Sequence, residues 1–312
     1  MVGLQQIACY VPEKKVNVSA FLPLSTSQTQ SEMMEEKVIS QYGLHHIAVE
    51  EELTVHEMIE KAAATVLQKH AGTEEPITWI LHTHTFHPFT PYLVDPISSI
   101  QLDWGLENAK VRCIAQMNCA SIDMLLQFAN RLLLQEQQGA ILLLCADKMI
   151  IPDSRYLKDS TVSGDAAAAM ILSSQSEHHQ LLASVIQCDA SLYHSVQSDP
   201  ADFAWFQQSF YMGLVKILRR GVKQAGIQLS QLTFIFPSNV NELTWRSIAS
   251  ACEMDDDVFY YPTMREVGHA HNADPLLNLQ HALTHQALKK GDYYATLTVG
   301  MGSTFGCSVF QY

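Results

Sequence analysis

The chain has few charged residues, few basic side chains and no long apolar run. Charged residues make up 16% of the 312 residues and hydrophobic residues 47%, a balance that excludes an intrinsically disordered chain. The longest apolar run, Ala140–Ala146, is far shorter than the ~20 residues that cross a bilayer, so we expect no membrane-spanning segment. The 19 Lys and Arg face 32 Asp and Glu, and the resulting net charge of −13 disfavours binding to nucleic acid. The first residues, Met1–Gln6, lack the basic flank and apolar stretch of a signal peptide, so we expect a cytoplasmic protein.

Several common site motifs are also missing. The 7 cysteines form no C-x-x-C pair, and their odd number and spread predict free thiols rather than a disulfide framework. The glycines of Gly300–Ser303 do not open a helix, so a dinucleotide site is not expected. His82, His84 and His87 follow a strand pattern, but the sequence offers them no clear further ligand, and we expect no metal site.

Short apolar runs alternate with helical patterns along the chain. This alternation predicts an α/β fold with crossover units and a mostly parallel sheet covered on both faces. The segment 191–215 is rich in aromatic residues and lacks a clear period, so we expect an irregular insertion that caps a pocket. The predicted strands are 78–82, 140–146, 168–172, 234–236, 295–299 and 306–310, and the predicted helices are 53–68, 121–135 and 241–254.

One cysteine is placed differently from the others. Cys119 follows a short apolar stretch, Val111–Ala115, and directly precedes the helical pattern that begins at Ser121. A strand-to-helix turn would place its sulfur at a helix N-terminus, where free N–H groups and the helix dipole favour a thiolate. The pattern therefore indicates a candidate nucleophile, although a buried cysteine that only fills space fits the same position.

A candidate base lies in the densest polar cluster of the chain, Val267–Pro275. His269 and Asp274 in this cluster would complete a nucleophile, base and orienting group of the kind used in acyl transfer. Asp274 followed by Pro275 is also typical of the start of a helix, so a purely capping role for this carboxylate stays open.

Six short segments, in order along nearly the whole chain, resemble the β-ketoacyl-ACP synthase III family of thiolase-fold enzymes. The resemblance implies an α/β, thiolase-like layered αβαβα fold with two similar halves. Residues 1–173 would carry the nucleophile and residues 174–312 the base. It also identifies Cys119 as the nucleophile. The six segments are Ile7–Glu13, Tyr42–Ala48, Asn118–Ser121, Ser163–Ala169, Phe236–Asn241 and Gly300–Gly306.

Two positions depart from the family members that condense an acyl group with malonyl-ACP. Those members carry a His and an Asn that together bind the malonyl thioester oxygen, and this sequence has Ser238 and His269 there. A divergent branch places a His at the Asn position and an Asp five residues later, and its members resemble acyltransferases. His269 and Asp274 have this spacing. The resemblance thus implies a Cys119–His269–Asp274 triad with His269 as general base. The backbone N–H groups of Cys119 and Met301 would hold the oxyanion.

The resemblance also implies the donor and its binding regions. No cofactor would be bound permanently, and acyl-ACP or acyl-CoA would be the donor substrate. The segment Tyr42–Ala48, near which the family binds the adenine of coenzyme A, is two residues shorter here, which favours a carrier-protein donor. A basic helix face, in which Lys216 resembles the family's docking lysine, would receive the acyl carrier protein, and an ordinary solvated face is the alternative. This face consists of Lys216, Arg219, Arg220 and Lys223, and the expected pantetheine or acyl pocket contains Asn241, Ser238, Trp205 and Phe206.

The sequence thus predicts a homodimeric acyltransferase of secondary metabolism, in polyketide or fatty acid biosynthesis. Its acceptor would be a small-molecule or carrier-bound alcohol, amine or thiol. Two alternatives stay open. One is a β-ketoacyl-ACP synthase III-type enzyme that makes a C–C bond, in which His269 or His271 does the work of the missing pair. The other is a non-catalytic partner subunit of a ketosynthase heterodimer, which the intact Cys119 disfavours.

Overall fold

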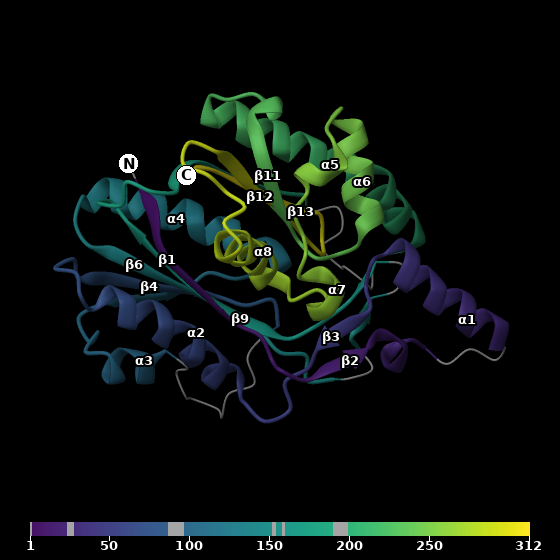
Figure 1. Ribbon diagram of the computed structural model, residues 1–312, viewed down its shortest axis with the longest axis horizontal. Coiled ribbons are helices and arrows are strands. Elements are labelled where there is room, and N and C mark those ends of the chain that lie inside the picture. The colour runs from purple at the N-terminus through teal and green to yellow at the C-terminus, as the bar shows by residue number, and fades with distance from the viewer. Residues whose placement is uncertain (1, 24–27, 87–96, 152–153, 158–159, 190–198) are drawn as a thin grey trace.

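The computed structural model describes the chain except residues 1, 24–27, 87–96, 152–153, 158–159 and 190–198 (Figure 1). Its helices are α1 Gln28–Glu36, α2 Val55–His70, α3 Ser98–Asp103, α4 Ser121–Glu136, α5 Pro200–Ala225, α6 Glu242–Ala251, α7 Met264–Val267 and α8 Asp274–Thr284. The strands of the large sheet are β1 Gly3–Tyr10, β4 Ile77–Thr83, β5 Lys110–Cys113, β6 Ala140–Asp147, β9 Ala166–Ser173, β10 Gln180–Cys188, β11 Leu232–Pro237, β12 Tyr293–Gly300 and β13 Thr304–Gln311. Short strands form two small ribbons, β2 Lys15–Asn17 with β3 His46–Ala48 and β7 Tyr156–Leu157 with β8 Thr161–Val162.

The large sheet repeats one arrangement twice. Its order is β11-β12-β13-β10-β1-β9-β6-β4-β5. In the first half β1 pairs antiparallel with β9, β9 antiparallel with β6, and β6 parallel with β4. In the second half β10, β13, β12 and β11 pair in the same sequence of directions. The two similar halves expected from the sequence are therefore visible as repeated topology.

Helices lie on the outer faces and between the two halves of the sheet (Figure 1). One apolar cluster joins α2 to β1, β6 and β9, and another joins α5 and α6 to β10, β11, β12 and β13. A third cluster, in the middle, contains the apolar faces of α4 and α8 with side chains from both halves of the sheet. These contacts give the layers αβαβα, and the expected fold class is confirmed.

The central helix α4 is held by a buried carboxylate. Asp123 accepts hydrogen bonds from the hydroxyls of Thr296, at 2.8 Å, Thr298, at 2.5 Å, and Ser308, at 2.5 Å. Burial raises the pKa of Asp123 even though these three hydrogen bonds lower it. Since the hydroxyls come from β12 and β13, the carboxylate ties the start of α4 to the C-terminal half.

Two sequence expectations need correction. The sheet is mixed rather than mostly parallel, because β9 and β13 run antiparallel to both of their sheet neighbours. The aromatic segment is not irregular from Pro200 onward, since α5 begins there with Pro200 in its first turn and the Asp199 side chain as its cap. Residues 190–198 of that segment lie outside the described residues. The boundary between residues 173 and 174 stays a prediction, and it falls in the connection from β9 to β10.

Among the described helices, none combines the length and the apolar composition that crossing a bilayer requires.

Candidate active site

Cys119 lies on a tight turn that leads into α4. The turn, Asn118–Ala120, is a single 3₁₀ turn, and Gln116 and Asn118 before and within it have positive φ values of 76° and 49°. Gly300 lets the end of β12 reach this turn, because a Cβ there would lie 2.4 Å from the Met117 carbonyl oxygen. The sequence expectation that Cys119 lies at the start of a helix thus agrees with the geometry, and its role as nucleophile stays a prediction.

Two glycines allow the His269 backbone to enter the same region. A Cβ on Gly164 would lie 1.9 Å from the Val267 carbonyl oxygen, and Gly268 has a φ of +75°. With this space available, the Gly164 N–H donates to the His269 carbonyl at 3.0 Å, and the His269 N–H donates to the Val162 carbonyl at 3.0 Å. The segment around Gly164 therefore positions the histidine.

The structure brings Cys119, His269 and Asp274 together. His269 Nε2 lies 3.3 Å from the Cys119 sulfur, and His269 Nδ1 lies 2.5 Å from Asp274 Oδ2. All three side chains are buried. The Asp274 carboxylate also accepts backbone N–H bonds from Asn239 and Ala270, both at 2.6 Å. This is the arrangement of a nucleophile, a base and a group that orients the base.

The surroundings of His269 favour its protonated form. Burial alone would lower its pKa, but the charges of Asp274 and Cys119 and hydrogen bonds to both outweigh burial and raise the pKa to about 10. The Asp274 carboxylate, 2.5 Å from Nδ1, favours the imidazolium in this way. The site therefore favours a proton on His269, which the imidazolium can give to a leaving group.

Asp274 is not the cap of its helix. α8 begins at Asp274 itself, whose φ and ψ are already helical, and no side chain caps this end of the helix. The carboxylate turns back toward His269 instead of toward the N–H groups of α8. The capping role that the sequence left open is therefore excluded.

Two neighbours of His269 also belong to the site. His271, which the sequence offers only in the condensing alternative, places Nδ1 3.2 Å from the Cys119 sulfur. Asn272 accepts a hydrogen bond from the Ile122 N–H at 3.0 Å and donates to the Asn118 carbonyl at 3.1 Å, so it fixes the nucleophile turn. The only sequence signal for these roles was the number of polar residues in this segment. Residue types alone do not show which side chains face the sulfur, because backbone conformation decides that.

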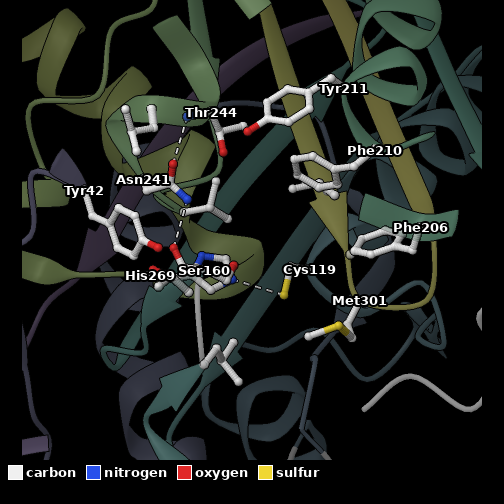
Figure 2. A pocket seen from close by; sticks show the side chains of 16 residues that line it. Tyr42, Cys119, Ser160, Phe206, Phe210, Tyr211, Asn241, Thr244, His269 and Met301 are labelled. Atoms are coloured by element: carbon white, nitrogen blue, oxygen red, sulfur yellow. Dashed lines mark hydrogen bonds between the residues drawn. The ribbon is translucent and has the colours of Figure 1, made fainter. Parts of the chain in front are cut away.

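A cavity of about 340 Å³ opens onto Cys119 and His269 (Figure 2). The aromatic side chains of α5 line one wall, and the other wall comes from the start of α6 and its surroundings. Its lining residues are Tyr42, Cys119, Leu157, Ser160, Thr161, Phe206, Phe210, Tyr211, Val240, Asn241, Leu243, Thr244, His269, Val299, Gly300 and Met301.

Two residues expected in this pocket lie elsewhere. Ser238 is fully buried behind the wall, where the Val299 N–H donates to its hydroxyl at 3.4 Å. Trp205 is 53% exposed and does not line the cavity, because it precedes Phe206 on α5 and consecutive helical residues point in directions ~100° apart. The correction places Phe206, and not Trp205, at the cavity.

Asn241 and Met301 line the cavity at the expected positions. Asn241 caps α6 by accepting the Thr244 N–H at 2.8 Å and donates to the Ser160 carbonyl at 2.9 Å. The side-chain amide of Asn118 donates to the carbonyl of Met301, which holds that backbone beside the nucleophile turn. Their roles toward pantetheine and an oxyanion remain predictions.

The expected basic face exists as an exposed stripe. Lys216, Arg219, Arg220 and Lys223 are all exposed on α5, on the opposite side from the buried Leu214, Ile217, Leu218 and Val222.

The chemistry of the site also fits a transition metal. One ligand atom each from Cys119, His269 and His271 lies within 4.8 Å of the others, and the Asp274 bond to His269 is the outer contact that metal-bound histidines make. His87, of the pattern that includes His82 and His84, lies outside the described residues.

Comparisons with known proteins place the chain in a family. A profile of 3-oxoacyl-[acyl-carrier-protein] synthase III matches residues 115–190, and a profile of the C-terminal part of that enzyme matches residues 222–312. A search of curated protein sequences found no match.

Solved structures show the same fold. ChlB3, described as an acyltransferase, is 18% identical with a TM-score of 0.84, covering 99% of this chain and 97% of that one. The 3-oxoacyl-[acyl-carrier-protein] synthase III of Aquifex aeolicus VF5 is 15% identical with a TM-score of 0.84 over 100% of both chains. The priming β-ketosynthase of the R1128 polyketide pathway is 17% identical with a TM-score of 0.82, covering 100% of this chain and 96% of that one. The two profile matches together span more than half of the sequence and include Cys119, His269 and Asp274, so the chain belongs to the 3-oxoacyl-[acyl-carrier-protein] synthase III family of thiolase-fold enzymes.

Proposed function

We propose that this protein is an acyltransferase. It takes an acyl group from a carrier-protein or coenzyme A thioester onto Cys119 and passes it to an alcohol, amine or thiol. The observation that carries this proposal is the hydrogen-bonded chain from Cys119 through His269 to Asp274, with distances of 3.3 and 2.5 Å. A histidine in this position can act as a general base, whereas the asparagine of condensing relatives cannot.

The transfer runs in two half-reactions. In loading, the Cys119 thiolate attacks the donor carbonyl, a C–S bond to Cys119 forms, and the donor C–S bond breaks. The departing thiolate takes the proton from His269 Nε2. In release, neutral His269 takes the acceptor's proton as the acceptor attacks the acyl carbon, and Cys119 leaves as a thiolate. Asp274 stabilises the imidazolium at Nδ1, and base assistance of this kind contributes roughly 10²–10⁴-fold in rate.

Ser238 supports transfer over decarboxylative condensation. It occupies the position where condensing relatives carry a histidine, yet its hydroxyl is fully buried and accepts the Val299 N–H. Ser238 does not line the cavity, so it cannot bind a malonyl thioester oxygen there.

The second candidate function is condensation. His271 favours it, because two imidazole nitrogens, His269 Nε2 and His271 Nδ1, lie 3.3 and 3.2 Å from the Cys119 sulfur. A pair of imidazoles has the donors that a thioester enolate needs. Release of CO₂ from malonyl-ACP with formation of a 3-oxoacyl product would favour this candidate.

An acyl carrier protein is the proposed donor partner. The basic face lies on α5, whose earlier turns line the cavity with Phe206, Phe210 and the 41% exposed Tyr211. Lys216 lies five residues beyond Tyr211, about 7.5 Å along the helix axis and about 140° around it. Carrier proteins are acidic, so a charge reversal, Arg220→Glu, should slow loading from acyl-ACP while leaving loading from acyl-CoA unchanged. Equal slowing with both donors would reject docking at this face.

A homodimer is the proposed assembly. β5 is an edge strand of the large sheet, and an unpaired edge can add a strand from a second copy. Light scattering should give about twice the 34.9 kDa chain mass, and a monomer would reject the proposal.

The deciding experiment offers the protein a panel of acyl-CoA and acyl-ACP donors and follows its intact mass. We expect an acyl adduct that is absent in Cys119→Ala and retained in Cys113→Ala, a matched control at an exposed cysteine. Addition of alcohol, amine and thiol acceptors should then remove the adduct without CO₂ release. No adduct with any donor would reject the acyltransferase and favour a non-catalytic partner subunit.

A further inference from the structure

The backbone conformation and the contacts of His271 direct its imidazole toward Cys119. Its side chain is buried and its φ is +56°, a left-handed backbone conformation in which asparagine, aspartate and histidine are the commonest residues after glycine. This conformation points Nδ1 at the Cys119 sulfur, 3.2 Å away. On the other side, the Phe86 ring meets the imidazole edge to face at a centroid distance of 4.8 Å.

The surroundings of His271 favour a neutral imidazole. Burial lowers its pKa well below the usual value, and the charges of His269 and Arg155 lower it further. The rings of His269 and His271 are only 4.5 Å apart, so two imidazolium groups would repel each other in a buried site. The geometry favours a charge on His269 only, because the Asp274 carboxylate lies 2.5 Å from His269 Nδ1 and no described carboxylate bonds His271.

The position of the remaining proton follows from the partners of the ring. Among the residues that the structure describes, His271 Nε2 has no hydrogen-bond partner and is buried. A proton on Nε2 would leave a buried donor without an acceptor, whereas an unpaired acceptor is more readily tolerated. The proton thus belongs on Nδ1, where it is donated to the sulfur of Cys119.

We propose that His271 is a second catalytic histidine, which remains neutral and donates its Nδ1–H to the Cys119 sulfur in both half-reactions. This inference rests on the proposed acyl transfer. During release, His269 Nε2 must offer a lone pair to the acceptor's proton, so it does not donate to the sulfur at that moment. His271 needs no lone pair at Nδ1, so it can donate throughout. It stabilises the Cys119 thiolate when this thiolate attacks the donor and again when it leaves the acyl group. No atom is transferred from His271, and the proton balance of the two half-reactions is unchanged.

The test uses a pair of substitutions that differ in the donor. In His271→Asn, the amide nitrogen is attached to Cγ as Nδ1 is in the ring, and asparagine tolerates a positive φ. In His271→Leu, a methyl group takes that place and no donor remains. His271→Ala serves as a second donor-free variant should the leucine not fold. His281→Ala is a matched control, because His281 bonds Tyr260 rather than any residue of the site.

The first readout is the rate of iodoacetamide alkylation at Cys119 against pH, measured on the peptide by mass spectrometry. Loss of one hydrogen bond to a charged sulfur should move the midpoint of this profile up by about one to two pH units in the leucine or alanine variant. The asparagine variant should stay close to the unsubstituted protein. An unchanged midpoint without the donor, or an asparagine midpoint shifted as far as that of leucine, would overturn the inference.

The second readout is the single-turnover release of an acyl group already loaded on Cys119. The donor-free variants should release it about 10- to 100-fold more slowly, and asparagine should restore most of the rate. Failure of every donor to acylate Cys119 would reject the proposed function while the alkylation midpoints still decide the role of His271. Normal release in the donor-free variants would reject the role of His271 while acyl transfer stands.

Discussion

The Asp274 carboxylate has three buried hydrogen-bond partners, and the change Asp274→Asn cannot satisfy all of them. Oδ2 faces His269 Nδ1 and the Asn239 N–H, and Oδ1 faces the Ala270 N–H. If the new NH₂ group occupies the Oδ2 position, two donors face each other, the NH₂ group and the Asn239 N–H. His269 must then accept a hydrogen bond at Nδ1. His269 then carries its proton on Nε2 and cannot act as the base. If the NH₂ group occupies the Oδ1 position, it opposes the Ala270 N–H.

The expected loss is large because His269 depends on this charge. Burial alone would lower its pKa, yet the charges of Asp274 and Cys119 and hydrogen bonds to both raise it to about 10. Asp274 makes the largest favourable contribution to that rise. We expect Asp274→Asn to slow release of the acyl group from Cys119 by roughly 10²–10⁴-fold at pH 7.

The assay is single-turnover release from acyl-Cys119, followed by intact mass, together with Cys119 alkylation at pH 7. Asp257→Asn is the matched control, because Asp257 is exposed and lies outside the site. Circular dichroism and thermal unfolding would establish that both variants fold. A folded Asp274→Asn protein that alkylates and transfers at the unsubstituted rate would refute the assignment of Asp274 as the orienting group of His269.

Two further predictions concern ionisation and metal binding. Burial raises the pKa of Asp147 to about 7, although N–H groups of Thr85 and Phe86 bond it, so the folded state keeps a proton that the unfolded state loses above about pH 4. Relative to Asp147→Asn, the free energy of unfolding should therefore fall by about 3 kcal/mol from pH 5 to 8. Urea unfolding at the two pH values measures it, and an equal change in both proteins would contradict the prediction. Added Zn²⁺ should block alkylation of Cys119, and EDTA should restore it. In His271→Ala the apparent affinity for Zn²⁺ should be weaker by at least about 10-fold. An equal block in that variant would show that zinc binds elsewhere.

The sequence predicted most of the central strands and helices, because their apolar periods are strong and their ends are marked. The strand pattern at 140–146 became β6, Ala140–Asp147, and the helical pattern at 121–135 became α4, Ser121–Glu136. The same local signals could not set strand direction, since that depends on how the two halves close on each other. They also missed the first part of α5, residues 200–215, because this aromatic-rich stretch that covers a cavity has no simple apolar stripe, whereas the basic spacing of residues 216–223 did predict a helix.

The amino-acid sequence by itself determined the chemical groups available for function. A cysteine at a helix start, a histidine and aspartate five residues apart, and the basic spacing of α5 can all be read from residue types and positions. Only the tertiary structure decided which of these groups meet. The nucleophile turn and the His269 loop are 150 residues apart, and glycines at 164 and 300 permit backbone approaches that no local pattern reveals. Long-range packing therefore turned Asp274 away from its helix and toward His269, removed Ser238 from the pocket, and placed His271 against the sulfur.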